Sequence, residues 1–298
     1  MDYGRDVRFG FFLTPDATDS QETVRLGKLC DEVGLDLIGI QDHPYQRRFF
    51  DTWTLLSYLA AQTSRVRLFP DVASLPLRPP AMLAKAAASL DVLSGGRIEL
   101  GLGTGAFWDG IKALGGPVRT PGEAVAALEE AIQVIRMIWT GERGLRFEGN
   151  HYNLLGAHSG PVPAHPIQLI IGAYGPQMLK LTGRLGDGWV PSSSYAPPAK
   201  LVEMNRRIDE GAQEAGRVPA SIQRMYNIMG QITSGDTSNE YFHAPVERWV
   251  DELTRLTLEH GMDTYIFGAA HTHDRQIEIF AKEVAPAVRE NVTRARGG

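Results

Sequence analysis

The feature that most constrains the fold is a regular alternation of short apolar runs with longer segments of helical periodicity. The chain of 298 residues begins with an apolar run at 7–13 and a helical segment at 21–33, and this order then repeats. The other predicted strands are 35–40, 66–74, 98–103, 167–172, 188–191, 224–232 and 263–267, and the other predicted helices are 52–62, 79–93, 121–139, 176–185, 198–215, 245–260 and 275–288. Strands that alternate with helices predict a parallel sheet covered by those helices.

Eight strand–helix units in one chain favour an α/β fold of the closed (β/α)8 or TIM-barrel type over an open sheet. Such a barrel occupies about 250 residues, which leaves room for an insertion. The segment at about 141–166, after the fourth unit, is rich in Gly, Pro and His and holds short aromatic runs, so it predicts a hairpin-bearing insertion. We expect one domain over 1–298 with a flexible tail at 289–298.

The sequence contains a motif that predicts where one helix begins. Thr120 precedes Pro121, and Glu123 follows three positions after Thr120. This is the spacing of a capping box, in which each of the two side chains accepts a hydrogen bond from the other residue's backbone amide. We therefore expect the long helix to begin at residue 121.

Charge and composition narrow the class of partner. The net charge of −5 offers no basic field for nucleic acid. The longest apolar runs fall short of the roughly 20 residues that span a bilayer, and the first six residues lack the apolar core of a signal peptide. Cys30 is the only cysteine, so no internal disulfide forms, and its helical setting predicts a buried thiol. The cytoplasm is the expected compartment.

Catalytic groups of such barrels lie where the strands end, so these positions carry the search for chemistry. The second predicted strand ends in Asp42 and His43, with Tyr45 close behind. Histidine can donate, accept or shuttle a proton near neutral pH, and the adjacent carboxylate can orient it or bond a ligand. The alternative is an exposed loop histidine without a role. The neighbouring tyrosine and the strand-end position favour a functional pair.

Glycine-rich segments follow two other predicted strands. The run 101–105 lets a flat or anionic ligand approach the backbone, although a tight barrel turn would use the same residues. The run 172–176 leads directly into a helix, whose free amides and dipole suit a phosphate, although a plain turn with a first-position proline is the alternative. Neither run matches the dinucleotide-binding fingerprint, and no Walker lysine motif is present.

Further strand ends carry aromatic and histidine side chains. Trp108 and Trp189 lie near strand ends and could line a pocket. His271, His273 and Asp274 could ligate zinc or iron, but no further ligand motif supports them, so we expect no metal. Asp274 is better explained as the N-cap of the last helix.

Taken together, these motifs resemble those of one enzyme family. The segments that carry the resemblance are Asp42-His43 and the runs 90–97, 101–105, 147–152, 172–176 and 186–189. The chain from residue 7 to about 288 is similar to the luciferase-like family, which contains bacterial luciferase-type monooxygenases and their deazaflavin-using relatives. Each motif is weak alone, and the set is specific.

The resemblance implies a TIM barrel that binds FMN or coenzyme F-420 at the carboxyl ends of its strands. It implies a non-prolyl cis peptide at Asp71-Val72, behind the cofactor ring, and a ring edge near Asp42 and His43. The residues expected to bind the cofactor are Asp42, Asp71, Val72, Gly103, Thr104, Gly105, Ala106, Gly172, Ala173, Tyr174 and Gly175. His43 would handle the proton in catalysis, and Asp42 would orient it or the cofactor.

One departure from the family affects the substrate. The sugar-phosphate dehydrogenases of the family carry a glutamate just after the Thr-Gly of the fourth strand, where this chain has Ala106 and Phe107. An apolar wall therefore replaces an acid, which predicts a flat, hydrophobic small molecule. The residues expected to line its pocket are Tyr45, Phe107, Trp108 and Trp189.

These features predict an oxidoreductase that transfers hydride to or from a small organic substrate. Asp42-His43 resembles the deazaflavin branch, which favours F-420 over FMN. The alternatives are a monooxygenase that uses reduced FMN to activate O2, a non-catalytic flavin-binding protein on the same barrel, and a metal-dependent hydrolase. Family members commonly form homodimers, so a homodimer is expected.

Overall fold

A parallel sheet rolled almost into a closed barrel forms the centre of the molecule. The structure is a computed structural model, and it describes residues 1–235 and 242–297. The barrel strands follow the order β3-β2-β1-β12-β10-β9-β8-β5-β4, and every neighbouring pair is parallel. Their bounds are β1 Arg8–Leu13, β2 Leu37–Ile40, β3 Arg67–Pro70, β4 Ala73–Ser74, β5 Leu100–Gly103, β8 Leu169–Ile171, β9 Gly188–Trp189, β10 Gln223–Ile232 and β12 Thr264–Ala269.

The two ends of this sheet meet between β3 and the residues before β5. Leu68 and Ile98 form a parallel bridge, in which the Leu68 amide donates to the Arg97 carbonyl at 2.9 Å and the Glu99 amide donates to the Leu68 carbonyl at 3.1 Å. Because β3 and β4 are the two parts of the predicted strand 66–74, the nine strands fill eight barrel positions. The predicted TIM barrel is confirmed.

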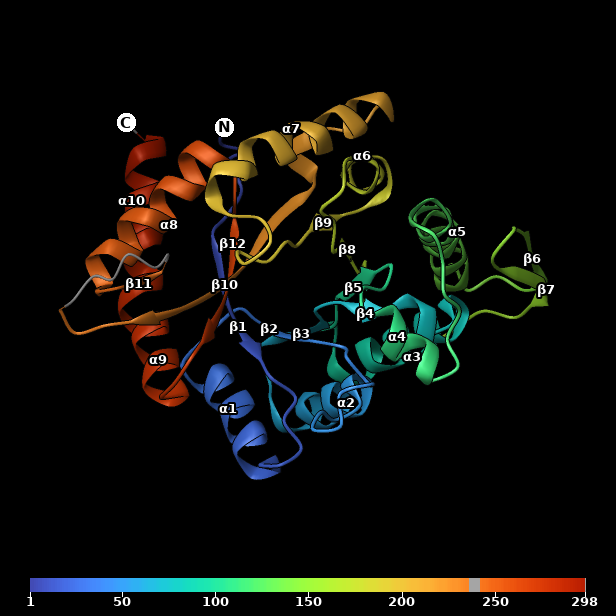
Figure 1. The fold of residues 1–298 in the computed structure, drawn as a ribbon, viewed down its shortest axis with the longest axis horizontal. Coiled ribbons are helices and arrows are strands. Elements are labelled where there is room, and N and C mark those ends of the chain that lie inside the picture. Colours follow the sequence, from blue (N-terminus) through green and yellow to red (C-terminus); the bar gives the residue numbers. More distant parts are fainter. Residues whose placement is uncertain (236–241, 298) are drawn as a thin grey trace.

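Helices surround the strands on the outside (Figure 1). Their bounds are α1 Ser20–Glu32, α2 Thr52–Gln62, α3 Pro80–Ser94, α4 Trp108–Ala113, α5 Pro121–Trp139, α6 Pro176–Leu185, α7 Pro198–Glu214, α8 Val246–His260, α9 His273–Ile279 and α10 Ala285–Gly297, with single turns at Leu75–Leu77 and Pro219–Ser221. The capping box is present, since the Thr120 hydroxyl accepts from the Glu123 amide and the Glu123 carboxylate accepts from the Thr120 amide. The short helix α4 was not predicted.

The expected hairpin lies in the insertion. Strands β6 (Leu145–Glu148) and β7 (Asn153–Ala157) pair antiparallel in a sheet of their own. The hairpin lies at the periphery beside α5, away from the barrel strands (Figure 1). Of the predicted loop 233–244, residues 236–241 lie outside the described residues, and the short strand β11 (His243–Ala244) pairs with the end of β10.

The end of the chain differs from the prediction. The expected flexible tail at 289–298 is wrong for its described part, because α10 continues to Gly297 after a π-helical turn at Phe280–Val284. Arg296 binds the Asp2 carboxylate at 2.7 Å, and Val292 is buried, so the helix is docked beside the N-terminus (Figure 1). Asp274 lies in the first turn of α9 and is not its N-cap, which is Thr272.

Two apolar cores result from the barrel. The larger one lies between the strands and the surrounding helices. A smaller one fills the barrel interior and consists of Leu37, Phe69, Ile170, Val190, Met225 and Ile266, with Phe12 and Val72 packed against it. This inner core closes the barrel below its carboxyl ends, so a ligand can enter only the space above it.

Candidate functional site at the carboxyl ends of the strands

A break in the third strand position sets the centre of the site. Strand β3 ends at Pro70, the Asp71-Val72 peptide is cis, and β4 begins at Ala73. The expected cis peptide is therefore present in the structure. The Asp71 amide still donates to the Ile40 carbonyl at 2.8 Å, so the segment stays attached to β2 while its two side chains enter the barrel.

Glycines make room for this bulge. A Cβ atom on Gly103 would lie 2.6 Å from a Val72 methyl group, and one on Gly172 would lie 3.1 Å from it. A Cβ on Gly101 would overlap the Pro70 carbonyl oxygen, and one on Gly39 would lie 2.8 Å from the Asp71 carboxylate. A side chain at position 101 or 103 would force the bulge to shift, whereas one at position 39 or 172 would need a smaller adjustment of Asp71 or Val72. Gly101 and Gly103 thus accommodate Pro70 and Val72, whereas the sequence suggested that they accommodate a ligand or form a tight turn.

The Asp42 carboxylate is fully bonded inside the protein. It accepts hydrogen bonds from Arg78 Nε and Nη2, both at 2.7 Å, and from the Ser74 amide at 2.9 Å. Its side chain has no exposed surface. Arg78 also binds Asp51, the N-cap of α2. Asp42 therefore connects β2, β4 and α2, and the structure does not place its carboxylate toward a ligand as the sequence suggested.

His43 belongs to an aromatic cluster with Tyr45 and Phe107. Ring centroids lie 5.4 Å apart for His43 and Tyr45, and 5.3 Å apart for His43 and Phe107 in an edge-on arrangement. His43 Nδ1 is hydrogen-bonded to the Tyr45 hydroxyl. Burial lowers the pKa of His43, against the opposing charge of Asp42, and burial raises the pKa of Tyr45 to about 12. A neutral imidazole beside a protonated phenol results at neutral pH.

A polar pair that sequence reasoning missed lies deeper in the barrel. Asp71 and Asn227 of β10 are 8% and 3% exposed, and among the described residues Asp71 Oδ2 and Asn227 Oδ1 have no hydrogen-bond partner. Burial raises the pKa of Asp71 to about 7, and Asn227 opposes this rise. An asparagine within the apolar run of β10 was the signal that could have identified the pair, because buried polar groups need a reason.

Tyr174 lies next to this pair. Its hydroxyl accepts a hydrogen bond from the Ser192 amide at 3.0 Å, and the Ser192 hydroxyl accepts one from Asn227 Nδ2 at 3.4 Å. The Asp71 carboxylate contributes to the raised pKa of Tyr174, after burial as the main cause. Segments after β3, β8 and β9 therefore meet strand β10 in one polar network.

The residues expected at a phosphate group lie where β5 and β8 run into helices. Gly105 has a φ of +97°, and Thr104 and Ala106 beside it are at least partly exposed. Helix α6 begins after Gly175 without a side-chain cap, and open space surrounds the position of a Gly175 Cβ. Ala173 is buried, and its carbonyl accepts from Trp189 Nε1. The α6 amides are thus available to an anion.

The two predicted pocket tryptophans have different positions. Trp108 is the first residue of α4, and its ring lies 3.3 Å from the Cβ position of Gly105, so it covers the segment after β5. Trp189 is fully buried in the outer core, between strand and helices. The Cβ position of Gly188 lies 3.1 Å from Ile170 of the inner core, so the next side chain of the strand, Trp189, points outward. Trp189 therefore does not line the pocket, and that expectation is corrected.

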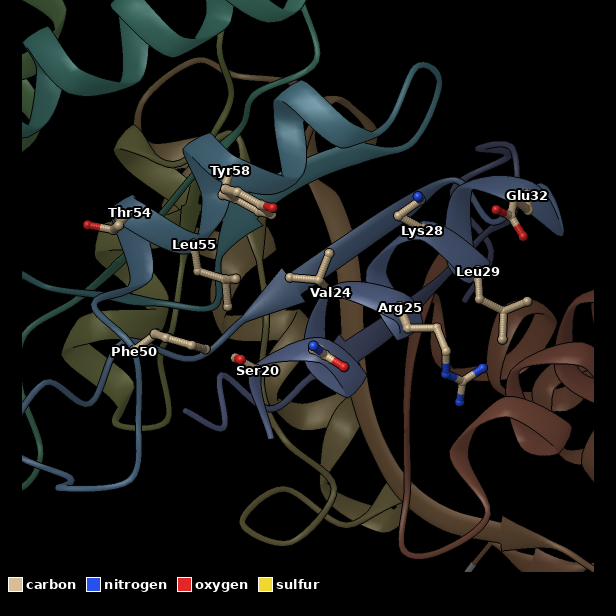
Figure 2. A pocket seen from close by; sticks show the side chains of 11 residues that line it. Ser20, Val24, Arg25, Lys28, Leu29, Glu32, Phe50, Thr54, Leu55 and Tyr58 are labelled. Atoms are coloured by element: carbon tan, nitrogen blue, oxygen red, sulfur yellow. The ribbon is translucent and has the colours of Figure 1, made fainter. Parts of the chain in front are cut away.

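A separate groove of about 650 Å³ runs between α1 and α2 on the outside of the barrel. Figure 2 shows Val24, Leu29, Phe50, Leu55 and Tyr58 along it, with Arg25, Lys28 and Glu32 on α1. None of its lining residues comes from the predicted site, so it is not part of the site at the strand ends.

Two general properties of the described ranges bear on function. Within them, no three His, Cys, Asp or Glu side chains converge as metal ligands would. None of the helices in the part of the chain that the structure describes combines the length and the apolar character needed to cross a membrane.

Comparison with known proteins identifies the family. A family model described as luciferase-like monooxygenase matches residues 7–291. The chain belongs to the luciferase-like monooxygenase family. The resemblance predicted from the motifs is thereby confirmed, and the match covers both the hairpin insertion and most of α10.

Curated relatives of this luciferase-like chain include F-420-dependent glucose-6-phosphate dehydrogenases. It is 30% identical to the F-420-dependent glucose-6-phosphate dehydrogenase 1 of Rhodococcus jostii, over 95% of this chain and 98% of the relative. It is 35% identical to the F-420-dependent glucose-6-phosphate dehydrogenase of Kineococcus radiotolerans, over 76% of this chain and 68% of the relative.

Solved structures share its fold. An F-420-dependent secondary alcohol dehydrogenase in complex with an F-420–acetone adduct gives a TM-score of 0.85 at 20% identity, over 95% of this chain and 99% of that one. A coenzyme F-420-dependent tetrahydromethanopterin reductase from Methanopyrus kandleri gives 0.82 at 21% identity, over 95% and 99%. A monooxygenase from Streptomyces bottropensis gives 0.78 at 20%, over 94% and 99%.

Proposed function

We propose that this luciferase-like protein is an F-420-dependent oxidoreductase that transfers hydride between the cofactor and a small, apolar or flat alcohol or carbonyl compound. The observation that carries the proposal is the cluster of His43, Tyr45 and Phe107, which follows β2 and β5 above the bulge at Asp71-Val72. It combines a group that can move a proton with an apolar wall. The curated relatives with F-420-dependent activity support the choice of cofactor.

The residues present fit a flat cofactor with an anionic tail. Val72 offers an apolar surface, and the glycines at 103 and 172 give its side chain the space to enter the barrel. Asp71 and Asn227 offer buried polar atoms without partners. The uncapped N-terminus of α6 and the segment 103–106 would hold the anionic part. Bound there, the cofactor would supply or accept the hydride, while the protein orients the reactants and excludes water.

His43 is the residue proposed to move the proton. A neutral imidazole can accept the proton of a substrate hydroxyl on Nε2 while its Nδ1–H donates to the Tyr45 hydroxyl. The imidazolium would return the proton to the substrate oxygen in the reverse reaction. Asp42 acts as a positioning residue, because its charge raises the pKa of His43 while its own oxygens remain bonded to Arg78 and Ser74.

The strand-end segments argue against a sugar phosphate as the substrate. Ala106 and Phe107 replace the acid that the sequence comparison expects in sugar-phosphate dehydrogenases. The segments 14–16, 41–45, 71–74, 104–108, 172–175, 190–193, 227–233 and 268–274 contain neither lysine nor arginine. Within these segments a phosphate ester would find no cationic side chain. We accordingly propose an uncharged substrate, although the curated relatives are named for glucose-6-phosphate.

The test is an absorbance assay of cofactor reduction with purified protein and a panel of secondary alcohols, aldehydes and glucose-6-phosphate. The proposal predicts turnover of one or more uncharged alcohols and none of glucose-6-phosphate. Turnover of glucose-6-phosphate in preference to every uncharged compound would refute the substrate class while leaving the cofactor assignment in place.

Two alternative functions predict different measurements. Structural neighbours include monooxygenases, so FMN-dependent oxygen activation would appear as substrate-dependent oxygen uptake with reduced FMN. A non-catalytic flavin-binding protein would bind cofactor without turnover. The presence of His43 with its Tyr45 partner favours catalysis over simple binding.

We also propose a homodimer that acts in the cytoplasm. Exposed apolar side chains on α2 and α3 support the dimer, with Tyr58 54%, Met82 66% and Leu93 83% exposed. A second copy of the chain would cover them. Light scattering coupled to gel filtration measures the mass, and a particle of one chain at micromolar concentration would refute the dimer. Cell fractionation tests the compartment.

A further inference from the structure

Asp71 and Asn227 form a buried polar pair. The sequence motifs did not predict that these two residues lie together. Both side chains enter the barrel above the inner core, Asp71 from the bulge and Asn227 from β10. Asp71 Oδ2 and Asn227 Oδ1 have no partner among the described residues. A buried polar atom without a partner costs about 1–3 kcal/mol. Such atoms at the floor of a ligand site indicate that the missing partner is the ligand.

The surroundings determine which of the two side chains can donate a hydrogen bond to a ligand and which can accept one. Asn227 donates from Nδ2 to the Ser192 hydroxyl, so its Oδ1 remains free as an acceptor. Burial holds the pKa of Asp71 near 7, so a substantial fraction of its carboxyl group is protonated at neutral pH and can donate. Together the two side chains offer a donor and an acceptor side by side.

We propose that Asp71 and Asn227 recognise the cyclic-imide edge of the cofactor's pyrimidine ring. Such an edge alternates carbonyl oxygens with an N–H group, and both flavins and deazaflavins have it. The imide N–H donates to Asn227 Oδ1, and an adjacent carbonyl accepts from the Asp71 carboxyl. This assignment rests on the proposed function, because it requires that a cofactor of this class occupies the site.

The position of the pair favours the cofactor over the substrate. Asp71 directly precedes Val72, whose methyl groups lie against the Cβ positions of Gly103 in the neighbouring strand β5 and of Gly172 just after β8. His43, Tyr45 and Phe107 form the separate cluster that faces the substrate in the proposed function. Because Asp71 and Val72 are consecutive residues of the bulge, a ligand that bonds to Asp71 and Asn227 is expected beside Val72, where the proposed function places the flat cofactor.

The experiment compares cofactor affinity with stability in four variants, using fluorescence titration of the apoprotein and thermal unfolding without cofactor. Asp71→Ala and Asn227→Ala should each weaken binding about tenfold or more, the loss expected for one hydrogen bond in a buried site. Asp71→Asn supplies an N–H donor in the same place, so its affinity should stay within about threefold of wild type. The unliganded Asp71→Ala protein should melt at or above the wild-type temperature, because an unpartnered buried carboxyl group is removed.

Gln223→Met is the matched control. Gln223 is also on β10 and buried, but its amide is bonded to Thr264 Oγ1 at 2.7 Å. It should lower the melting temperature and leave cofactor affinity unchanged. A structural role for Asp71 would instead give lower stability with unchanged affinity.

Three outcomes overturn the inference. If the wild-type protein binds the cofactor, and Asp71→Ala and Asn227→Ala both bind it as tightly as the wild type, this inference alone is refuted. An effect of both variants on substrate KM with unchanged cofactor affinity assigns the pair to the substrate and also refutes it. Failure of the wild-type protein to bind either cofactor refutes the proposed function together with this inference.

Discussion

Arg78 holds both oxygens of the Asp42 carboxylate, with Nε 2.7 Å from Oδ2 and Nη2 2.7 Å from Oδ1. The Ser74 amide donates to the same carboxylate at 2.9 Å. Because Arg78 follows β4 and Asp42 follows β2, this ion pair connects the two strand ends on either side of the bulge. Asp42 is thereby held in place next to His43, with its carboxylate bonded inside the protein.

Removal of Arg78 should destabilise the protein strongly. Arg78→Met leaves the Asp42 carboxylate buried without its main partner, and loss of one member of a buried pair typically costs about 3–5 kcal/mol. The free energy of unfolding in urea measures the loss. Arg48→Met is the control, because Arg48 is 69% exposed and binds Asp16 at the surface, where a pair contributes less than about 1 kcal/mol. Equal losses for the two variants would contradict the role assigned to Arg78.

Alanine substitutions of the glycines around the bulge should differ in whether a second substitution, Val72→Ala, restores the lost stability. Gly103→Ala brings its Cβ to 2.6 Å from a Val72 methyl group, so Val72→Ala should restore much of the stability that it loses. Gly101→Ala meets the Pro70 carbonyl oxygen of the backbone, so Val72→Ala should not rescue it. We expect losses of about 1–3 kcal/mol for each single variant, in the range of overpacked cores.

Thermal unfolding of the single and double variants measures the rescue. Gly122→Ala serves as the control, because open space surrounds its Cβ position in the first turn of α5, and it should be neutral or slightly stabilising. Rescue of both Gly101→Ala and Gly103→Ala by the same Val72→Ala change would show that the two glycines do not make separate contacts.

The sequence predicts the barrel and its helices well because their signals are local. Thr120 and Glu123 specify the start of α5 through neighbouring residues alone. The need for glycine at positions 101 and 103 is not a local signal, because the atoms that a side chain would meet belong to Pro70 and Val72 on the adjacent strand. The orientation of Trp189 was predicted wrongly for a related reason. Both faces of a parallel strand are buried, so apolar character does not reveal which side chain enters the barrel.

The pH dependence of turnover should follow His43. Burial lowers its pKa below 6.5, so the neutral form that accepts a proton is present above that pKa. The value of kcat/KM for alcohol oxidation should therefore rise with pH through a pKa below 6.5 and then level off. His43→Gln should remove this step and reduce kcat by about 10²–10⁴-fold. A pH profile that His43→Gln leaves unchanged would exclude His43 as the base.

His165 gives a second pH effect, on stability at the opposite end of the barrel. Hydrogen bonds to Glu99 at 3.3 Å and Asp91 at 2.9 Å raise the pKa of His165 above 6.5. The stabilisation is fully present below the unfolded-state value near 6.5 and is lost as pH rises through the folded-state pKa. His165→Gln should thus lower the free energy of unfolding at pH 5.5 more than at pH 9.

Urea unfolding at several pH values measures this difference. Glu99→Gln provides the control, because it removes the first-ranked cause of the raised pKa and should reduce the pH dependence of the His165→Gln effect. An effect of His165→Gln that is constant across this range would mean that packing, and not charge, determines the contribution of His165.

The candidate site was predicted in part. Asp42 and His43 were found because a strand end marks them in the sequence, and the cis peptide at Asp71-Val72 followed from the family resemblance. Arg78 and Asn227 were missed. Arg78 lies four residues beyond the end of β4, and its partner Asp42 is 36 positions away in the chain. Asn227 is one of several polar residues in β10, and only the closed barrel brings it to face Asp71.

The central claim is that the barrel mouth binds a deazaflavin for hydride transfer, and titration of the apoprotein with F-420 and, separately, with FMN tests it most directly. Cofactor fluorescence reports each binding curve. The account predicts micromolar binding of F-420 and much weaker binding of FMN. Tight binding of FMN alone would contradict the deazaflavin assignment and favour oxygen chemistry, and binding of neither cofactor would contradict the proposed function as a whole.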